Sequence, residues 1–355
     1  MLKDDTNLQM NYAFDQNIMN ENELMGSVSD KLNRMAEYDK KELIACQRNK
    51  TDLQGLVDFV NSIFAKYQIN DRITCKHIRF NAGYIGNILK VDDKKLSQII
   101  FDKYFPKPTR QSYYHFTSFE AFKSILENKK LRLSNLNKRF NDGEFTTFYE
   151  EHGMDGYKKG GVIFGIDCSD KAIMSKIFFL SLTGSGYNHG DNTLWRDFGD
   201  NGDGIRLEFK VTPKTLDFRE IFYSTPKFDN SLPMLKELFT EIKAKYGLPF
   251  NFAFSSKIGA YYIKGKFQNE NEFRFIIKTT ADDYNAWGVQ SVTVNEEKAI
   301  EYIEIDFLND YADFELLTVQ PGYNCSDDDI REIESIIVKS GLSAMVTAKA
   351  LENYI

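Results

Sequence analysis

The chain has 355 residues, of which 42% are hydrophobic and 14% aromatic, and its net charge is −7. These values fit one large domain or two smaller ones, with enough apolar side chains for a sizeable core. They exclude the overall basic character typical of nucleic-acid-binding proteins, and no apolar run is long enough to predict a membrane span.

The first part of the chain predicts helices. Residues 1–26 are rich in Asn, Asp and Met and are expected to be loosely ordered. From 27 to 104 apolar residues recur mainly at helical spacing, and the segment YIGNILKVDDKKLSQIIFDKYF predicts one or two of these helices. This helical N-terminal region has a local excess of Lys and Arg, which is typical of a solvated helical surface. Its helices are also a candidate surface for oligomerisation or for recruiting a partner.

From residue 109 to 355 strands and helices alternate irregularly, without a βαβ repeat. This pattern predicts an α+β domain with mixed, mostly antiparallel sheets and a central cleft. YYHFT predicts a strand, and Ser118 can cap the helix that follows it. LPMLKELFTEIKAKYG predicts a helix that Gly247 closes, and Ser326 with Asp329 has the spacing of a capping box at the start of the last helix.

One face of the strand YYHFT carries polar groups. Positions i and i+2 of a strand share a face, so Tyr113, His115 and Thr117 are expected to point the same way. Tyr114 and Phe116 point to the opposite face. Taken alone, His115 is more simply explained as a half-buried strand histidine with satisfied hydrogen bonds.

A second strand, in the segment ENEFRFII, shows the same arrangement. Glu270, Glu272 and Arg274 are expected on one face, and two such strands would line a cleft together. Ser181 and Thr183 add hydroxyl groups at the same i, i+2 spacing in FFLSLTG. The alternative is that Glu272 and Arg274 form an ion pair that fixes the strand register.

A turn-like segment, FNDGE, adds Asn141, Asp142 and Glu144 as further polar candidates, although Asn, Asp and Gly are also ordinary turn residues. The four cysteines lie far apart and the histidines share no metal-ligand spacing. These residues predict no metal site and no disulfide framework, which fits a reducing cytoplasm.

The order of these segments resembles a known family. The succession YHFTS, FKSILENKKLRLS, FNDGE, FFLSLT, NTLWRDFG, GIRLEF, KGKFQNENEFRFII and VQPGYNCSDDDIREIESII is similar to that of the DUF2971 family. The likeness covers roughly residues 111–350. The family is largely uncharacterised, so it implies little about chemistry.

A more distant likeness implies more. His115-Phe116-Thr117, the helix FEAFKSILENKKL, the strand IFFLSL and the later Glu272 resemble the motif order of the DNA-targeting ADP-ribosyltransferase toxins. This resemblance implies that His115 and Thr117 hold the ribose and amide of NAD and that Glu272 is the catalytic glutamate. Asn128 stands where the pattern has glycine.

That resemblance fixes no arginine for the pyrophosphate, and Arg132 and Arg139 are the candidates. Tyr113, Asn141, Ser181 and Arg274 complete the expected NAD site. The leading hypothesis is therefore an NAD-consuming enzyme, an ADP-ribosyltransferase or NAD glycohydrolase, in a toxin or antiphage-defence role with a nucleic-acid or protein acceptor. The alternative is a sensor module that binds a nucleotide or nucleic acid without turnover. A two-metal nuclease ranks last, because no suitable carboxylate cluster is present.

Overall fold

A ten-stranded sheet organises the part of the chain that the structure describes. The computed structural model describes residues 36–37, 40, 52–81, 84–86, 95–105, 107–109, 112–137, 144–152, 162–163, 166–167, 170–187, 192–215, 217–224, 232–252, 255–279, 287–294 and 298–351. Eight strands follow the order β14-β15-β4-β7-β3-β8-β16-β17, while β13 pairs with the opposite edge of β7 and β9 pairs with β13.

The strands of this sheet are antiparallel to their neighbours, except for β17, which runs parallel to β16. The predicted α+β architecture with mostly antiparallel sheets is therefore confirmed. In chain order the strands are β3 (Ser112–Thr117), β4 (Lys130–Asn135), β7 (Ile177–Gly184), β8 (Ile205–Pro213), β9 (Phe218–Glu220), β13 (Glu272–Lys278), β14 (Gln290–Val294), β15 (Lys298–Asp306), β16 (Ala312–Pro321) and β17 (Met345–Val346).

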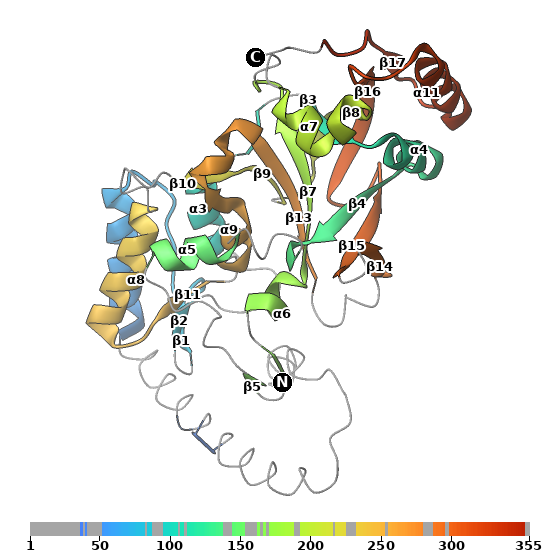
Figure 1. Cartoon of the computed structure of the whole chain (residues 1–355). Helices are drawn as coiled ribbons and strands as arrows, with labels where there is room; N and C mark the ends of the chain where they lie inside the picture. The colour runs from blue at the N-terminus through green and yellow to red at the C-terminus, as the bar shows by residue number, and fades with distance from the viewer. Residues whose placement is uncertain are drawn as a thin grey trace, which may run out of the picture.

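Two helices cover one face of the sheet, α4 (Phe119–Asn128) and α11 (Asp327–Ser340), which lie together on its right in Figure 1. Apolar residues of both helices share a buried cluster with alternate residues of the strands, such as Leu180 and Leu182 of β7. Strand alternation explains this: one face of β7 faces α4 and α11, and the residues between face the other way.

The opposite side of the sheet faces a layer of other helices, seen on the left of Figure 1. This layer contains helix 52–66, α3 (Lys95–Tyr104), α5 (Thr146–Glu151), α8 (Pro233–Tyr246) and α9 (Ser255–Tyr261). Residues of helix 52–66 and α3 share one buried cluster with Phe179 of β7 and Ile276 of β13. The N-terminal helices are therefore part of the same core as the sheet.

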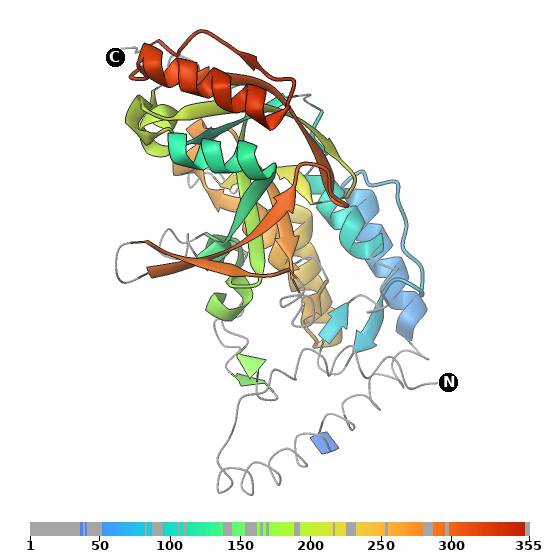
Figure 2. The same ribbon diagram turned by 90° about the vertical axis from the view of Figure 1, so that its right-hand side faces the viewer.

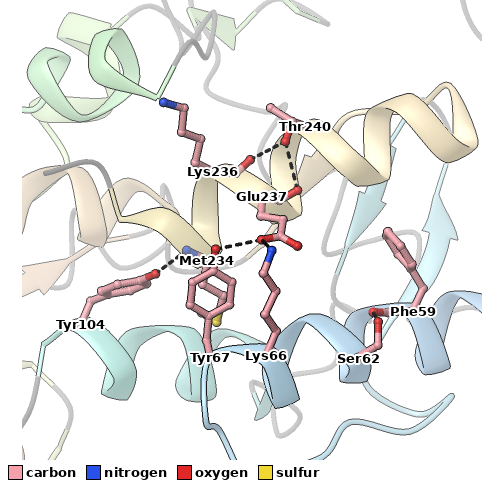
Figure 3. Close-up of polar contacts among 9 residues, drawn as sticks. All are labelled: Phe59, Ser62, Lys66, Tyr67, Tyr104, Met234, Lys236, Glu237 and Thr240. Atoms are coloured by element: carbon pink, nitrogen blue, oxygen red, sulfur yellow. Dashed lines mark hydrogen bonds and ion pairs between the residues drawn. The ribbon is translucent and has the colours of Figure 1, made fainter. Parts of the chain in front are cut away.

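Polar contacts join the N-terminal helices to α8, as Figure 3 shows. Lys66 and the Tyr67 hydroxyl both donate to the Glu237 carboxylate, at 2.7 and 2.8 Å, and the hydrogen bond from Lys66 lowers the pKa of Glu237. The Tyr104 hydroxyl accepts the backbone N–H of Met234 at 2.8 Å, beside the proline that begins α8. These bonds orient α8 on α3 and helix 52–66.

The predicted helix caps are confirmed. The Ser118 hydroxyl accepts the Ala121 N–H at the start of α4, and Ser326 and Asp329 form a complete capping box on α11. Helix α8 begins with Pro233 and ends at Gly247, whose left-handed φ of 70° closes the helix.

One local prediction is wrong. The segment 84–105 does not form helices throughout, because Tyr84–Gly86 is a strand, β2, while Lys95–Tyr104 is the helix α3. Strand β2 pairs with β1 (Arg79–Asn81) and with β11 (Phe250–Asn251). Tertiary pairing with a strand 160 or more residues away overrides the local helical pattern, as is common for short apolar runs.

The remaining elements are small. No described helix combines the length and apolarity that crossing a membrane requires. The remaining described elements are β5 (Val162–Ile163), β6 (Ile166–Asp167), α6 (Asp170–Met174), α7 (Thr193–Phe198), the 3-10 helices η2 (Asp200–Gly202) and η3 (Gly265–Glu270), and the parallel pair β10 (Phe222–Ser224) and β12 (Tyr262–Lys264).

Candidate functional site

The sheet forks along one edge of β7. On this edge β3 pairs with Thr183 and Gly184, whereas β4 pairs with Phe178 and Phe179. Among the described strands none pairs with residues 180–182 here, while β13 pairs continuously along the other edge. Strand β3 continues toward β8 and β4 toward β15, so the two halves of the sheet separate at this point (Figures 1 and 2).

A pocket of about 390 Å³ lies at this fork and is named the fork pocket here. Helix α4, which connects β3 to β4, forms one wall, and α7 forms another. The described lining residues are Tyr114, His115, Phe116, Thr117, Ser118, Ala121, Ser124, Ile125, Asn128, Lys130, Arg132, Ser134, Phe179, Leu180, Ser181, Thr183, Leu194, Asp197, Phe198, Glu270 and Glu304.

His115 replaces part of the missing strand pairing. Its Nδ1 lies 3.2 Å from the Ser181 carbonyl oxygen, in the section of β7 that lacks a strand partner on this edge. Since a carbonyl oxygen only accepts, Nδ1 carries the proton and donates, and in the neutral ring the lone pair is on Nε2. The hydrogen bond thus sets both the orientation of the imidazole and its tautomer at the pocket wall.

Aromatic rings form much of the remaining wall. Phe116 packs edge-on against Trp195 of α7, with ring centroids 5.0 Å apart, and this contact holds α7 beside β3. Tyr114 packs against Tyr187 and lies under the Arg206 guanidinium, 4.2 Å from its ring centroid. Rings at such positions offer flat surfaces on which a planar ligand can stack.

Charged residues on the β4 side of the pocket stand opposite acids of the neighbouring strand. Arg132 donates through Nε to Glu304, at 3.1 Å, and its guanidinium lies 4.8 Å from the Tyr302 ring centroid. Arg132 and Glu304 are cross-strand partners, as are Lys130 and Asp306. Each cation of β4 therefore faces an acid of β15 on the same side of the sheet.

A buried charge cluster lies behind β7, on the helical-layer side. Glu272, Arg274 and Glu144 are 1%, 1% and 3% exposed. Arg274 donates to both oxygens of Glu272, at 2.7 and 3.0 Å, contacts Glu144 at 2.8 Å and donates to the Ala260 carbonyl. Burial alone would lower the pKa of Arg274, but the two carboxylates outweigh it and raise that pKa above its ordinary value.

This cluster adjoins the fork pocket, since Arg274 and Glu272 are the cross-strand partners of Ser181 and Thr183, which line it. The Arg274 guanidinium lies 4.7 Å from the centroid of the Phe179 ring, which also lines the pocket. The Glu272 N–H donates to the Tyr223 hydroxyl, and burial followed by the Glu272 charge raises the pKa of Tyr223. Glu272 and Arg274 form the ion pair that the sequence left open as an alternative.

The structure brings four of the predicted site residues together and separates others. His115, Thr117, Arg132 and Ser181 all line the fork pocket. Tyr113 does not, because it is fully buried between Phe218 and Phe273, in edge contacts at 4.9 Å. Glu272 and Arg274 are not among the lining residues, and Asn141 lies outside the described residues.

Strand register explains this separation. Thr183 is opposite both Tyr114 and Glu272, so these two side chains share a face of the sheet. Tyr113, His115 and Thr117 therefore project from the other face. Tyr113 meets the core there because β3 is still paired with β7, whereas His115 and Thr117 reach the pocket because β3 has left β7.

The prediction from strand alternation is wrong for Glu270, whose carboxylate belongs to the pocket. The sequence predicted that Glu270 and Glu272 share a face, but Glu270 belongs to η3 and β13 begins only at Glu272. Asn271 between them has a left-handed φ of 44°, and its carbonyl accepts the Gly184 N–H at 2.9 Å. This turn sends Glu270 to the pocket and Glu272 into the interior.

Other lining residues were missed altogether. Glu304, Asp197 and Phe198 were not singled out, although Glu304 sits in an alternating strand pattern, AIEYIEIDF, whose register with KLRLS would have paired it with Arg132. No signal in the sequence alone fixes that register. Among the described residues, no group of three or more His, Cys, Asp or Glu is placed to hold a metal ion.

Comparison with known proteins adds no relative. No family model matches the chain, and no curated protein and no solved structure matches it either.

Proposed function

We propose that this protein is an NAD-consuming enzyme and that the fork pocket is its substrate site. The observation that carries the proposal is the convergence of His115, Thr117 and Ser181 with the carboxylate of Glu270 and the ring of Phe179 around one opening. The resemblance of the H-x-T strand and its helix to ADP-ribosyltransferase toxins supports the same reading. A split in a sheet with flat aromatic and hydroxyl-bearing walls suits a nucleoside.

The reaction breaks the bond between the ribose C1′ and the nicotinamide nitrogen. The bonding electron pair leaves with nicotinamide and neutralises its ring, while positive charge develops on the sugar. A carboxylate near the 2′-hydroxyl stabilises that charge, as carboxylates do in glycosidases. Water, or another hydroxyl or amine, then forms the new bond to C1′ and loses a proton.

The residues take these roles in the proposal. Glu270 supplies the carboxylate, because it lines the pocket while Glu272 is held by Arg274. His115 and Thr117 hold ribose hydroxyls, with His115 oriented by the Ser181 carbonyl. Phe179, fixed from behind by Arg274, stacks on the nicotinamide ring, and Arg132 meets a phosphate at the β4 wall.

Release of nicotinamide from NAD tests the proposal. Wild-type protein should release it, and Glu270→Gln should lower the rate by about 10²–10³-fold, the usual cost of losing one group that stabilises charge in a transition state. Glu334→Gln is a matched control on the exposed surface of α11 and should leave the rate unchanged. The rates should be compared among variants whose unfolding midpoints agree.

Three other outcomes bear on it. No nicotinamide release above background, with NAD bound, overturns the enzyme. Equal rates for wild type and Glu270→Gln overturn the role of Glu270. If nicotinamide release is slowed by Glu272→Gln in a folded variant and is not slowed by Glu270→Gln, the catalytic glutamate is Glu272, as the sequence predicted.

A second candidate is a sensor that binds a nucleotide without turnover. The buried ion pair between Glu272 and Arg274 favours the sensor, because Glu272 is the residue that the toxin resemblance implies as the catalytic glutamate. NAD binding measured by calorimetry without nicotinamide release, unaffected by Glu270→Gln, would support this sensor over the enzyme.

A further inference from the structure

The β4 wall of the fork pocket carries a regular pattern of charge. Lys130 and Arg132 alternate along β4 with Leu131 and Leu133, which are buried on the other face. Both cations thus belong to the pocket wall, and both line it. A wall with two cations would by itself be a strong site for a phosphate group.

The neighbouring strand β15 places an acid opposite each of these two cations. Asp306 is the cross-strand partner of Lys130, and Glu304 is the partner of Arg132. Cross-strand partners share a face, so each acid stands beside its cation on the pocket side of the sheet. Since Glu304 itself lines the pocket, its charge acts on any ligand there.

Arg132 is also held in place. Glu304 takes its Nε–H, and the guanidinium stacks on Tyr302, whose hydroxyl donates to Gln290 of β14 at 2.7 Å. A ligand phosphate that approaches the terminal nitrogens of Arg132 therefore comes close to the Glu304 carboxylate. A bridging phosphoryl group, such as each of the two in the pyrophosphate of NAD, carries one negative charge and gains from Arg132 more than it loses to Glu304. A terminal phosphomonoester carries nearly two charges and is repelled more strongly.

We infer that Glu304 is a specificity-determining residue, which makes the fork pocket select nucleotides whose phosphoryl groups are all bridging, with one charge each, and reject those with a terminal phosphomonoester. This inference rests on the proposed function, since it concerns the ligand of the same pocket. It goes further in assigning the substrate class: a dinucleotide such as NAD is accepted, and NADP is disfavoured because its additional phosphomonoester would lie near Glu304 at the β4 wall.

The test compares the dissociation constants of the full-length chain for NAD and NADP by calorimetry. Wild-type protein is expected to bind NAD at least about tenfold more tightly than NADP. Glu304→Gln should reduce this ratio by about fivefold or more, because it removes the repelling charge and keeps the size of the side chain. Glu304→Asp retains the charge and should retain most of the discrimination.

Glu315→Gln is the matched control, since Glu315 is an exposed strand glutamate paired with Lys210 outside the pocket. It should leave the ratio unchanged. Higher salt should narrow the wild-type ratio, because it screens the repulsion. If Glu304→Gln proves unstable, the ratio of the NADP and NAD dissociation constants in Glu304→Asp, and the salt dependence of that ratio in wild type, still test the selectivity.

The outcomes separate the two proposals. Equal binding of NAD and NADP by wild type, or a ratio that Glu304→Gln leaves unchanged, overturns the selectivity while the proposed function stands. Failure to bind either dinucleotide overturns both. Selective NAD binding without nicotinamide release overturns the enzyme and supports the selectivity.

Discussion

The fork pocket and the buried charge cluster use similar residues along opposite edges of β7, and they differ in what surrounds those residues. In the cluster, Arg274 donates to Glu272 and a backbone carbonyl and forms an ion pair with Glu144, and all three side chains are buried. In the pocket, Glu270 and Thr117 face an opening of about 390 Å³. Polar groups that satisfy one another in the interior fix the fold, whereas polar groups arranged around an opening can act on a ligand.

The largest expected effect comes from replacing Arg274, which lies at the centre of the buried charge cluster. Arg274→Met leaves Glu272 and Glu144 buried without their counter-charge, so the free energy of unfolding should fall by about 3–5 kcal/mol. Urea unfolding followed by circular dichroism measures it. Arg331→Met removes an exposed ion pair with Asp328 and should change stability by about 1 kcal/mol or less. Equal effects of the two changes would show that the cluster is not buried as described.

The two neighbouring glutamates sharpen the comparison. Glu272→Gln leaves Arg274 with one carboxylate, and we expect a loss of about 2–3 kcal/mol in the free energy of unfolding. Glu270→Gln, at the pocket edge, should change it by about 0.5 kcal/mol or less. Both variants belong in one series of denaturant titrations. The reverse order of effects would contradict the assignment of Glu270 to the pocket and Glu272 to the interior.

The fork itself depends on a weaker contact. His115→Ala removes the hydrogen bond to the Ser181 carbonyl, so we expect a loss of about 1 kcal/mol in stability together with weaker NAD binding. His115→Asn places a side-chain N–H near the same position and should recover most of the stability. Thermal unfolding with and without NAD separates the two effects, and full stability in His115→Ala would contradict the contact.

A smaller effect, far from both regions, calibrates the series. Ser326→Ala removes the capping box of α11 and should cost about 1 kcal/mol. Hydrogen bonds from the Ser326 hydroxyl and N–H lower the pKa of Asp329. Because the pKa of Asp329 is lowered in the folded chain, its ionised carboxylate stabilises the fold at any pH above the ordinary aspartate pKa of about 4. This stabilisation is lost as the pH falls below about 4 and through the lowered pKa. The difference between wild type and Ser326→Ala should therefore shrink at low pH.

The sequence predicted local structure well where the signals are local. The Ser118 cap, the Pro233 start and Gly247 end of α8, and the Ser326 capping box involve residues within a few positions of one another. Periodicity also identified the strands β3, β7 and β13 and the hydroxyl pair Ser181 and Thr183. Such features are decided by short-range sterics and hydrogen bonds, which a single sequence displays directly.

The candidate site was predicted less well, because it depends on register between distant strands. Strand alternation is correct for β3, but which face becomes pocket depends on where β3 leaves β7. Glu270 was misplaced because a single left-handed residue, Asn271, ends the 3-10 helix before the strand starts. Glu304 was missed because only the pairing of β15 with β4 brings it beside Arg132.

The shared core of the N-terminal helices has a practical meaning for expressing parts of this protein. Val60 and Phe64 of helix 52–66 and Phe101 of α3 are fully buried, in one cluster with Tyr261 and Ile276. A truncated chain starting near residue 109 would expose the apolar surface that these helices cover, so we expect aggregation in place of a soluble fragment. Chains shortened for crystallisation or assays should therefore retain everything from at least residue 52.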